Sequence, residues 1–396
     1  MTIRSRKKLK IMRVIARLNV GGPAIHTILL TDGMNNDTFE TMLVSGREAE
    51  QEGNMHYLAR EKNVDINHFP HLQRELSPMK DAKAFWEMVK LIRQFNPDII
   101  HTHTAKAGFI GRAAAIYLNT FRSAENKIKI VHTFHGHVFH SYFSTLKTNL
   151  FINIERFLGK FSDIIITITP KQQIEIKDFG IGTQINHQIV PLGLDLRKFK
   201  EKPRMPKSLH QQYNIPEDRI LIGTVARFTA IKNLSLFLEI AAKLIERNDK
   251  LHFMMVGDGE DREMLEAKAA ELGISDSVTF TGFLSDLPSV FADLSILLLT
   301  SKNEGSPVSI IEAMTSGTGV VASNVGGVPD LFTEEGKYFL CEPTNIDDYV
   351  EKTEKLLTDQ EFYNHITTVQ QDFIYNKFNI DRLIQDLSVT YQNLFS

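Results

Sequence analysis

The sequence predicts an α/β protein made of two successive domains, each with a parallel sheet covered by helices on both faces. Short apolar runs of strand length alternate with amphipathic stretches of helical spacing, which is typical of parallel sheets. The alternation stops at residues 191–218, a proline-punctuated and lysine-rich segment that reads as a linker, and then starts again. The length of 396 residues is too great for one ordinary core and suits two or three.

The elements of the first half are six strands and two helices. The strands are expected at Ile11–Ala16, Thr41–Ser45, Asp98–His103, Lys129–Phe134, Asp163–Thr169 and His187–Val190. The helices are expected at Pro78–Phe95 and Lys106–Leu118, where apolar residues recur with helical spacing.

The second half repeats this pattern. Strands are expected at Ile220–Ala226, His252–Val256, Ser277–Thr281, Leu294–Leu299 and Gly319–Ala322, and helices at Asn233–Arg247, Asp261–Leu272, Ser309–Ser316, Asp347–Leu357 and Asp381–Phe395. We therefore assign residues 1–200 to the first domain and 201–375 to the second, and expect 376–396 to form a helix that packs back on the first. Ligands of such sheets bind at the carboxyl ends of strands, so we expect a site in a cleft between the domains.

Composition points to a globular enzyme. Hydrophobic residues make up 42% and charged residues 23% of the chain, which is unlike a disordered or fibrous protein. Cys341 is the only cysteine, so the chain has neither an intrachain disulfide nor a cysteine-based metal centre. The apolar runs are shorter than the roughly 20 residues that span a bilayer, and no signal peptide is visible, so we expect a cytoplasmic protein.

Charge is distributed unevenly between the two halves. Residues 1–198 hold 27 Lys and Arg against 18 Asp and Glu, a net charge of +9, whereas residues 199–396 hold 18 against 30, a net charge of −12. A basic half can attract phosphate, anionic lipid or nucleic acid, although chance asymmetry with a solvated basic tail is the alternative. We expect an anionic membrane surface, and no nucleic acid, as a partner of the first domain.

The segment Glu304–Glu312 follows an expected strand and reads Glu-Gly-Ser-Pro-Val-Ser-Ile-Ile-Glu. Ser306 is a suitable N-cap and Pro307 suits the first helical position, so a helix should begin here. Its free N–H groups and dipole would favour an anion such as a diphosphate. The two glutamates are placed to accept hydrogen bonds from two sets of sugar hydroxyls. A capped surface helix with two solvated acids explains the same residues.

Two cations stand at the start of the second domain. Arg227 ends the expected strand Ile220–Ala226, and Lys232 follows five residues later at a helix start. Such a pair can hold a diphosphate and stabilise the charge that grows on it as its bond to a sugar breaks. Two surface cations that flank a helix are the alternative.

Glycine turns follow two strands. Gly257, in Gly-Asp-Gly-Glu, permits a tight turn between a strand and a helix and has a purely structural alternative. Gly21 and Gly22 lie between the first strand and the next helix. They do not complete the dinucleotide fingerprint Gly-x-Gly-x-x-Gly, and no acid stands clearly about 20 residues on.

Four histidines lie in the stretch His132–His140, at the end of an expected strand. A metal site is one interpretation, but the spacing is irregular and no cysteine or acid is close, so we expect no metal. Structural histidines are a second interpretation, and a histidine that touches a sugar is the third. His101 and His103, at the end of the preceding strand, should face the same side.

These segments together resemble the signature of retaining glycosyltransferase family 4, the glycosyl transferase group 1 domain. In that family a Glu-Gly-x-Pro turn is followed by a second Glu eight positions after the first, as at Glu304 and Glu312. The family also has an Arg and a Lys spaced like Arg227 and Lys232, a Gly-Asp-Gly turn, a glycine-rich loop near the N-terminus and Thr-Phe-His at a strand end. The resemblance covers nearly the whole chain in layout and is specific in residues 225–330.

The resemblance implies the GT-B fold, in which two Rossmann-like α/β domains face each other across a cleft, with the acceptor on the first domain and the nucleotide on the second. It implies that Glu304 contacts the transferred sugar and Glu312 the ribose. By the same match the site includes the catalytic candidates His135, Arg227 and Lys232 and the substrate-binding candidates Gly21, Gly22, Gly257, Gly305, Ser306, Pro307 and Val308.

The activity that the resemblance implies is retaining transfer of a hexosyl or N-acetylhexosaminyl group from a UDP- or GDP-linked sugar. The expected acceptor is a lipid-linked saccharide of polysaccharide or glycan biosynthesis, reached from the inner membrane face. No cofactor or metal is expected. A transferase with a small soluble acceptor and a non-hydrolysing nucleotide-sugar epimerase are the alternatives. The incomplete glycine fingerprint disfavours an NAD-dependent oxidoreductase, and the intact charged residues disfavour a non-catalytic binding protein.

Overall fold

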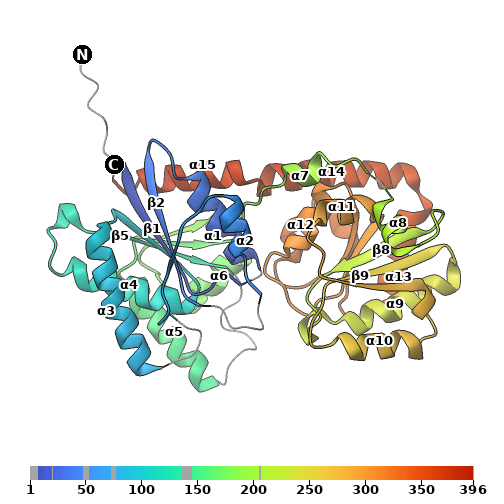
Figure 1. The fold of residues 1–396 in the computed structure, drawn as a ribbon, viewed down its shortest axis with the longest axis horizontal. Helices are drawn as coiled ribbons and strands as arrows, with labels where there is room; N and C mark the ends of the chain where they lie inside the picture. Colours follow the sequence, from blue (N-terminus) through green and yellow to red (C-terminus); the bar gives the residue numbers. More distant parts are fainter. Residues whose placement is uncertain are drawn as a thin grey trace, which may run out of the picture. The chain divides into compact units, whose positions relative to one another are not determined.

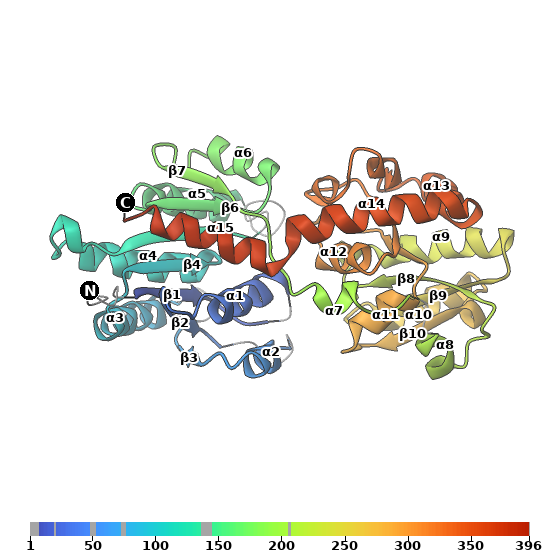
Figure 2. The same cartoon turned by 90° about the horizontal axis from the view of Figure 1, so that it is seen from above.

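The computed structural model describes residues 8–19, 21–47, 53–72, 77–135, 145–204 and 207–395. The chain forms two compact units (Figures 1 and 2). The first unit consists of residues 1–194 together with 379–396, and the second consists of residues 195–378. The C-terminal helix therefore belongs to the N-terminal unit.

The first unit contains a seven-stranded parallel sheet in the order β3-β2-β1-β4-β5-β6-β7. Its strands are β1 Leu9–Ile15, β2 Phe39–Ser45, β3 Ile66–His68, β4 Ile99–His103, β5 Lys129–Phe134, β6 Ile164–Thr167 and β7 Asn186–Ile189. The strand order reverses between β1 and β4. In open α/β sheets, ligands bind outside the carboxyl ends of strands at such a reversal.

Helices cover both faces of this sheet: α1 Gly22–Gly33, α2 His56–Glu61, α3 Pro78–Phe95, α4 Ala105–Asn119, α5 Thr145–Gly159, α6 Pro170–Asp178 and α15 Ile380–Gln392. Successive strand residues point to opposite faces. Met12 and Val14 accordingly belong to a core with α3 and α4, whereas Ile11 belongs to a core with α1 and α15. The C-terminal helix α15 thus completes the second of these two cores.

The second unit contains a six-stranded parallel sheet in the order β10-β9-β8-β11-β12-β13. Its strands are β8 Ile220–Val225, β9 Leu251–Val256, β10 Val278–Gly282, β11 Ile296–Leu299, β12 Gly319–Ser323 and β13 Leu340–Cys341. The order reverses between β8 and β11, as it does between β1 and β4 in the first unit.

The helices of the second unit are α7 Arg197–Lys200, α8 Ser208–Tyr213, α9 Leu234–Arg247, α10 Arg262–Glu271, α11 Leu287–Asp293, α12 Val308–Thr315, α13 Ile346–Thr358 and α14 Gln360–Phe378. Short 3₁₀ turns, among them η2 Ala230–Lys232, link some of them. Across both units, no helix in the described part of the chain combines the length and the apolar character needed to cross a bilayer.

In the segment expected to be a linker, residues 191–218, residues 191–194 belong to the first unit and the described residues 195–204 and 207–218 belong to the second. Arg204 donates to the carbonyl oxygens of Phe291 and Leu294 at 2.7 and 2.9 Å. The buried carboxylate of Asp293 accepts hydrogen bonds from the backbone N–H groups of Lys207 and Leu209 at 2.6 and 2.7 Å. Arg204, Lys207 and Leu209 thus attach the described parts of this segment to α11 and to the residue after it.

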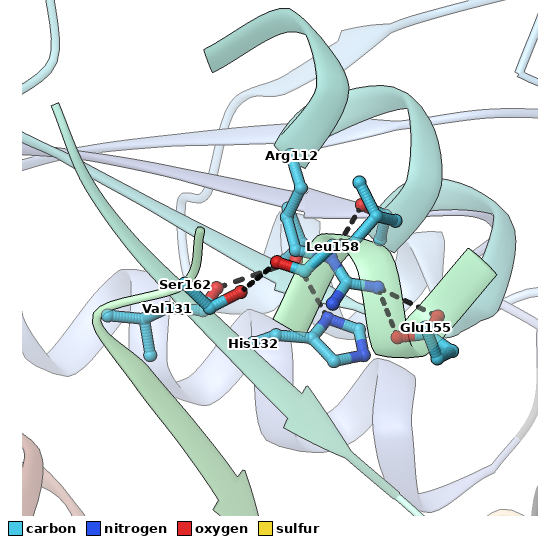
Figure 3. A network of polar contacts seen from close by, with 8 residues as sticks. Arg112, Val131, His132, Glu155, Leu158 and Ser162 are labelled. Atoms are coloured by element: carbon cyan, nitrogen blue, oxygen red, sulfur yellow. Dashed lines mark hydrogen bonds and ion pairs between the residues drawn. The ribbon is translucent and has the colours of Figure 1, made fainter. Parts of the chain in front are cut away.

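A buried ion pair connects α4 with α5 behind the first sheet (Figure 3). Arg112 Nη2 lies 2.7 and 2.6 Å from the two carboxylate oxygens of Glu155, and its Nε donates to the Gly108 carbonyl at 2.9 Å. His132, on β5 beside this pair, bonds through Nδ1 to Thr102 Oγ1 at 2.8 Å. Removing one partner of such a pair would leave an unpaired buried charge, which is strongly destabilising. The ion pair therefore holds α5 against α4.

Candidate active site

A small pocket lies at the ends of β8 and β11, where the strand order of the second sheet reverses. Its lining comes from the ends of β8 and β11, from the 3₁₀ turn η2 and from the start of α12. The lining residues are Thr224, Val225, Ala226, Lys232, Leu234, Leu297, Leu298, Leu299, Thr300, Ser301 and Ser309. The pocket has room for about one water molecule, so it marks the strand reversal at which this topology predicts a ligand but is too small to enclose one.

Two of the expected catalytic residues meet beside this pocket. Lys232 Nζ lies 2.5 Å from Glu304 Oε1, and both side chains are largely buried. Ser301 Oγ donates to the same carboxylate oxygen at 2.7 Å. Thr300 Oγ1 donates to the Lys232 carbonyl at 3.1 Å, which fixes the lysine backbone against the end of β11. The Lys232 ammonium group and the Ser301 hydroxyl therefore both bind Glu304 Oε1 and fix the carboxylate in position.

The backbone of Glu304 is supported by the segment Asn324–Asp330, which follows β12. The N–H of Gly327 donates to the Glu304 carbonyl at 3.0 Å. Gly326 has a φ of 54°, and a Cβ built there would lie 1.9 Å from the same carbonyl oxygen. Only glycine fits this position, so the segment contributes to the site through its backbone.

Helix α12 begins at Val308, one residue before the start at Ser309 expected from the helical spacing and one residue after the start at Pro307 expected from the cap. Pro307 is its N-cap, with an extended ψ of 115°, and Val308 is its first residue. The expected cap, Ser306, therefore lies outside the helix, in the partly exposed turn that also contains Gly305. The prediction of a serine cap with proline inside the helix was wrong, because proline at this position keeps extended backbone angles.

Glu312 lies one turn inside α12 and is partly buried. Burial raises the pKa of its carboxyl group to about 8. Most of this group is thus protonated at neutral pH, so the alternative of a solvated surface acid does not describe it. A neutral carboxyl group at this position can both donate and accept hydrogen bonds.

Arg227 and Gly257 lie at neighbouring strand ends. The Arg227 side chain is exposed and has no hydrogen-bond or ion-pair partner among the residues that the structure describes. Gly257 has a φ of 135°, and a Cβ there would lie 1.8 Å from the carbonyl oxygen of Ala226. The turn after β9 therefore packs directly on the end of β8, and only glycine permits this contact.

In the first unit, three histidines from three elements meet at the carboxyl ends of the central strands. His135 follows β5, His103 ends β4, and His26 lies in the first part of α1. His103 Nδ1 lies 2.8 Å from His135 Nε2. The His26 ring stands edge-on to His135, with ring centres 4.9 Å apart. Sequence reasoning singled out His135 and His103 but missed His26, because only the fold brings α1 beside β5.

These three imidazoles are neutral at physiological pH. Burial lowers the pKa of His135 to about 3, and it lowers the pKa values of His26 and His103 well below their ordinary range. Their nitrogen atoms lie within 4.8 Å of one another and could ligate a transition metal. No carboxylate belongs to this group, and the buried cation Arg13 acts on His103, which opposes a further positive charge.

The remaining histidines of the expected stretch do not join this cluster within the described residues. His132 takes part in the buried contacts around Arg112, and residues 136–144, which include His137 and His140, lie outside the described part of the chain. The cluster is therefore assembled by strand register and by α1, and of the described histidines His132 and His135 only His135 belongs to it.

A second layer of polar contacts supports the histidine cluster. His101 Nδ1 lies 2.5 Å from the hydroxyl of Tyr391 on α15, and its Nε2 lies 2.7 Å from Thr133 Oγ1. The His101 ring is tilted against His103, with ring centres 4.2 Å apart. Tyr391 was missed, since nothing in the C-terminal helical pattern indicates which strand its hydroxyl reaches.

The glycine loop of the first unit lies at the same sheet edge. Gly21 is the N-cap of α1 and Gly22 is its first residue. A Cβ at Gly21 would approach only the ring of Pro23, at 3.9 Å, so the backbone here is open to a ligand. Each unit thus gathers its own expected site residues at the carboxyl edge of its sheet.

Comparison with known proteins agrees with this arrangement. Residues 206–372 match the family model described as glycosyl transferases group 1, and residues 20–198 match that of glycosyltransferase family 4. UDP-Gal:alpha-D-GlcNAc-diphosphoundecaprenol alpha-1,3-galactosyltransferase of Escherichia coli is 28% identical over 327 residues, 81% of this chain and 82% of that protein. N-acetyl-alpha-D-glucosaminyl L-malate synthase of Bacillus anthracis is 24% identical over 317 residues, 80% of each chain.

Solved structures show the same fold. Anabaena HepE in complex with UDP is similar with a TM-score of 0.81 and 20% identity, over 97% of this chain and 100% of that one. The two family matches together span most of the chain, and both sheets have the expected architecture. The resemblance seen in the sequence is therefore confirmed: the chain belongs to glycosyltransferase family 4, has the GT-B fold and is a glycosyltransferase that uses a nucleotide sugar.

Proposed function

We propose that this protein is a retaining, metal-independent transferase that moves a hexosyl or N-acetylhexosaminyl group from a UDP-linked sugar to a lipid-linked saccharide. The observation that carries the proposal is the pair Lys232–Glu304 at the strand reversal of the second unit, with the exposed Arg227 at the neighbouring strand end. The two cations could bind the diphosphate of a nucleotide sugar, and the fixed carboxylate could bind the hydroxyls of its sugar.

The donor half of the reaction is assigned to the second unit. Arg227 and Lys232 balance the charge that develops on the diphosphate, aided by the free N–H groups at the start of α12. In the free protein Lys232 is neutralised by Glu304, so the bound phosphate would share this lysine with the carboxylate. Glu304 contacts the hydroxyls of the transferred sugar, Glu312 contacts the ribose, and the turn at Gly257 lies near the base.

Glu304 is proposed as a positioning group and not as a nucleophile. Its carboxylate oxygen is already bonded to Lys232 and Ser301, and these bonds reduce the electron density available for attack. Retention of the anomeric configuration then follows from attack on the face that the diphosphate leaves, with the leaving phosphate accepting the proton of the acceptor hydroxyl. The two separated carboxyl groups of a glycosidase are not needed for this route.

The first unit is proposed to contribute the acceptor side. His135 is neutral, so it can exchange hydrogen bonds with a sugar hydroxyl without adding a further positive charge to those of Arg227 and Lys232. The loop at Gly21 and Gly22 lets the backbone approach the reacting sugar. In the proposed reaction Arg227 and Lys232 take the part that a metal ion has in other transferases, so EDTA should leave the rate unchanged.

The lipid-linked acceptor is supported by the name of the E. coli relative, which acts on a diphosphoundecaprenol-linked sugar. The net charge of +9 on residues 1–198 supports work at the anionic inner face of a membrane. HepE was solved with UDP and with UDP-glucose, which supports a UDP-linked donor. A small soluble acceptor is the second candidate, because the B. anthracis relative is named for L-malate.

A donor panel tests the proposal. We expect one of UDP-galactose, UDP-glucose and UDP-N-acetylglucosamine to give sugar transfer to a synthetic polyprenyl-diphosphate saccharide, and NMR of the product should show the donor's anomeric configuration. Glu304→Ala should abolish transfer, and Lys232→Ala and Arg227→Ala should each lower the rate by roughly 10²-fold or more. Glu334→Ala, which removes a highly exposed carboxylate of the same unit, is the matched control. Full activity of Glu304→Ala would refute the site.

A further inference from the structure

We propose that one exposed face of α3, defined by Met79, Lys83, Trp86, Lys90 and Arg93 and called the α3 face below, seats the protein on an anionic phospholipid bilayer. The inference deepens the proposed function and depends on it only for the lipid-linked acceptor. These five residues follow one another at intervals of four and three along α3, so they share one side of the helix. All five side chains are exposed.

Apolar groups on the α3 face are unusually exposed. Met79 is 86% exposed and Trp86 is 57% exposed, whereas the opposite side of the same helix buries Ala84, Met88 and Ile92 in the core. Large apolar side chains in this position mark a surface that meets another phase or partner. Tryptophan in particular favours the interface between a membrane and water, where its ring is apolar and its N–H stays hydrated.

The aromatic surface continues onto α4 and the turn after it. The Trp86 ring stands edge-on to Tyr117 with ring centres 5.5 Å apart, and Tyr117 stands in the same way to Phe121 at 5.3 Å. Phe121 is 71% exposed. Arg122 donates to the side chain of Asn96, the C-cap of α3, at 2.9 Å, so this turn is held beside the helix. Helices α3 and α4 pack against each other (Figure 1), so the patch lies on a formed surface of two helices.

The charges of the α3 face select an anionic partner. Lys83, Lys90 and Arg93 carry positive charge, and α3, which is described throughout, has no acidic residue among its exposed positions. Its two acids are engaged elsewhere: Asp81 with Lys106 at 2.6 Å, and Glu87 with His71 at 2.9 Å. Clusters of basic residues with interfacial aromatics are attracted to anionic lipid headgroups.

A second copy of the chain fits this face poorly. In a symmetric dimer the same patch would meet itself, which would bring Lys83, Lys90 and Arg93 against their own equivalents. Like charges opposed across an interface are unfavourable, whereas an anionic bilayer neutralises all three. The charge pattern therefore favours the lipid surface.

The position of the α3 face suits a lipid-linked acceptor. The helix leads into the start of β4, so its first turns lie toward the carboxyl edge of the first sheet. The ion pair of Asp81 with Lys106 ties this end of α3 to the first turn of α4, directly after His103. A bilayer on the α3 face would thus present acceptor headgroups near the edge that carries the glycine loop and His135.

The chain has one tryptophan, Trp86, so its fluorescence reports this surface directly. We expect the emission of the full chain to shift to shorter wavelength on addition of vesicles of phosphatidylcholine and phosphatidylglycerol, and not with phosphatidylcholine alone. The variant Lys83→Gln/Lys90→Gln/Arg93→Gln should lose roughly 10²-fold in vesicle partitioning, measured by co-sedimentation. Trp86→Ser should also weaken co-sedimentation.

The matched control is Lys243→Gln/Arg247→Gln/Lys337→Gln, which changes the net charge equally through residues of the second unit whose side chains are 42%, 53% and 42% exposed. Its partitioning should equal that of the wild type. Equal partitioning of the α3 triple variant, or no emission shift with anionic vesicles, overturns the proposal. A shift that depends on protein concentration without lipid, with a dimer in analytical ultracentrifugation, also overturns it and assigns the face to a second copy.

The α3 proposal and the transferase proposal fail separately. Hydrolysis of the UDP-sugar in detergent-free buffer should be the same for the wild type and the α3 triple variant, which shows that the variant is folded and retains its donor site. Vesicle binding through α3 with no transfer from any donor would support the α3 proposal and refute the transferase proposal. Transfer to a soluble acceptor without vesicle binding would do the reverse.

Discussion

At the scale of single residues, we expect ligand binding to depend on the protonation of the Glu312 carboxyl group. Its pKa of about 8 means that roughly one molecule in ten carries the ionised group at pH 7. If the ribose hydroxyls donate to the ionised form, UDP affinity should rise about tenfold between pH 7 and pH 9, with release of a proton. Calorimetry in buffers of different ionisation enthalpy measures both quantities.

The variant Glu312→Gln checks the cause of this pH dependence. It should bind UDP with the same affinity at pH 7 and pH 9. Because the folded pKa lies above the unfolded value, ionisation removes stability as pH rises through 8, and glutamine avoids this loss. The variant should therefore unfold at higher urea concentration than the wild type at pH 8. A wild-type affinity that does not change with pH would contradict the role of Glu312.

The neutral histidine cluster makes the first unit sensitive to acid. The folded pKa of His135 is about 3 and the unfolded value is about 6.5, so its contribution to stability is complete above pH 6.5 and is lost as pH falls toward 3. At pH 5 this single group should lower the free energy of unfolding by roughly 2 kcal/mol relative to pH 7. His26 and His103 act in the same direction.

Urea unfolding followed by Trp86 emission tests this prediction, because Trp86 lies in the first unit. The loss of stability between pH 7 and pH 5 should be smaller in His135→Asn than in the wild type, since asparagine does not titrate. The exposed His365, in the second unit, provides the control variant His365→Asn. An equal loss in the wild type and His135→Asn would show that His135 is not held neutral.

At the scale of elements, the contact between the loop after β12 and the loop after β11 controls the position of Glu304. Gly326→Ala places a methyl group on the Glu304 carbonyl, which it can avoid only if the backbone of one loop moves. We expect a folded protein that transfers sugar at less than a tenth of the wild-type rate, since misplacement by about 1 Å can cost 10²-fold.

Gly273→Ala is the matched control for this variant. Gly273 also has a positive φ, 72°, but a Cβ there meets no atom within 4 Å. Both variants therefore carry similar backbone strain, and only Gly326→Ala disturbs Glu304. Comparable activity of the two variants, together with similar melting temperatures, would show that the contact does not position the carboxylate.

Many long apolar or amphipathic elements were predictable from the sequence, although the 15-residue helix α5 was missed, and short or atypical elements were not predictable. Pro78–Phe95 was predicted at its observed bounds because its buried residues recur every three or four positions. Strands β3 and β13 have three and two residues and carry no periodicity to detect. Helix α14 is rich in threonine, tyrosine and phenylalanine, which favour helices weakly, so its helical state depends on packing against the rest of the second unit.

At the scale of the whole molecule, the fold class and the strand ends that carry Lys232 and Glu304 could be predicted because each rests on local sequence. Glu304 and Lys232 lie at the ends of recognisable strands of one sheet, and the strand order brings them together. The histidine cluster needs the register of β4 against β5 and the placement of α1. Its support by Tyr391 joins residues 290 positions apart. Contacts of that kind leave no local pattern in a single sequence.

The placement of α15 in the first unit predicts an asymmetric response to truncation. Deletion of residues 379–396 removes Leu383, Leu387 and Tyr391 from a core of the first unit and leaves His101 without its tyrosine partner. The unfolding transition seen by Trp86 should be lost or shifted to much lower urea. Hydrogen exchange should show that β8 and β9 of the second unit stay protected.

Tyr391→Phe is the graded control for the deletion. It keeps the ring in the core and removes only the hydroxyl that meets His101. We expect a loss of about 1–3 kcal/mol, the usual effect of leaving one buried polar group unsatisfied. If the deletion destabilises the first unit no more than this substitution does, α15 is not part of its folding core.

The position of α15 at the end of the sequence also determines when the first unit can finish folding during translation. A ribosome releases the seven strands of the first sheet before it has made the helix that covers one side of that sheet. At roughly 5 to 20 residues per second, the whole second unit must be translated in the meantime, which takes about 10 to 40 seconds. For that interval the surface reserved for α15 stays bare, so the nascent protein is a candidate client for a chaperone that shields apolar strands until synthesis ends.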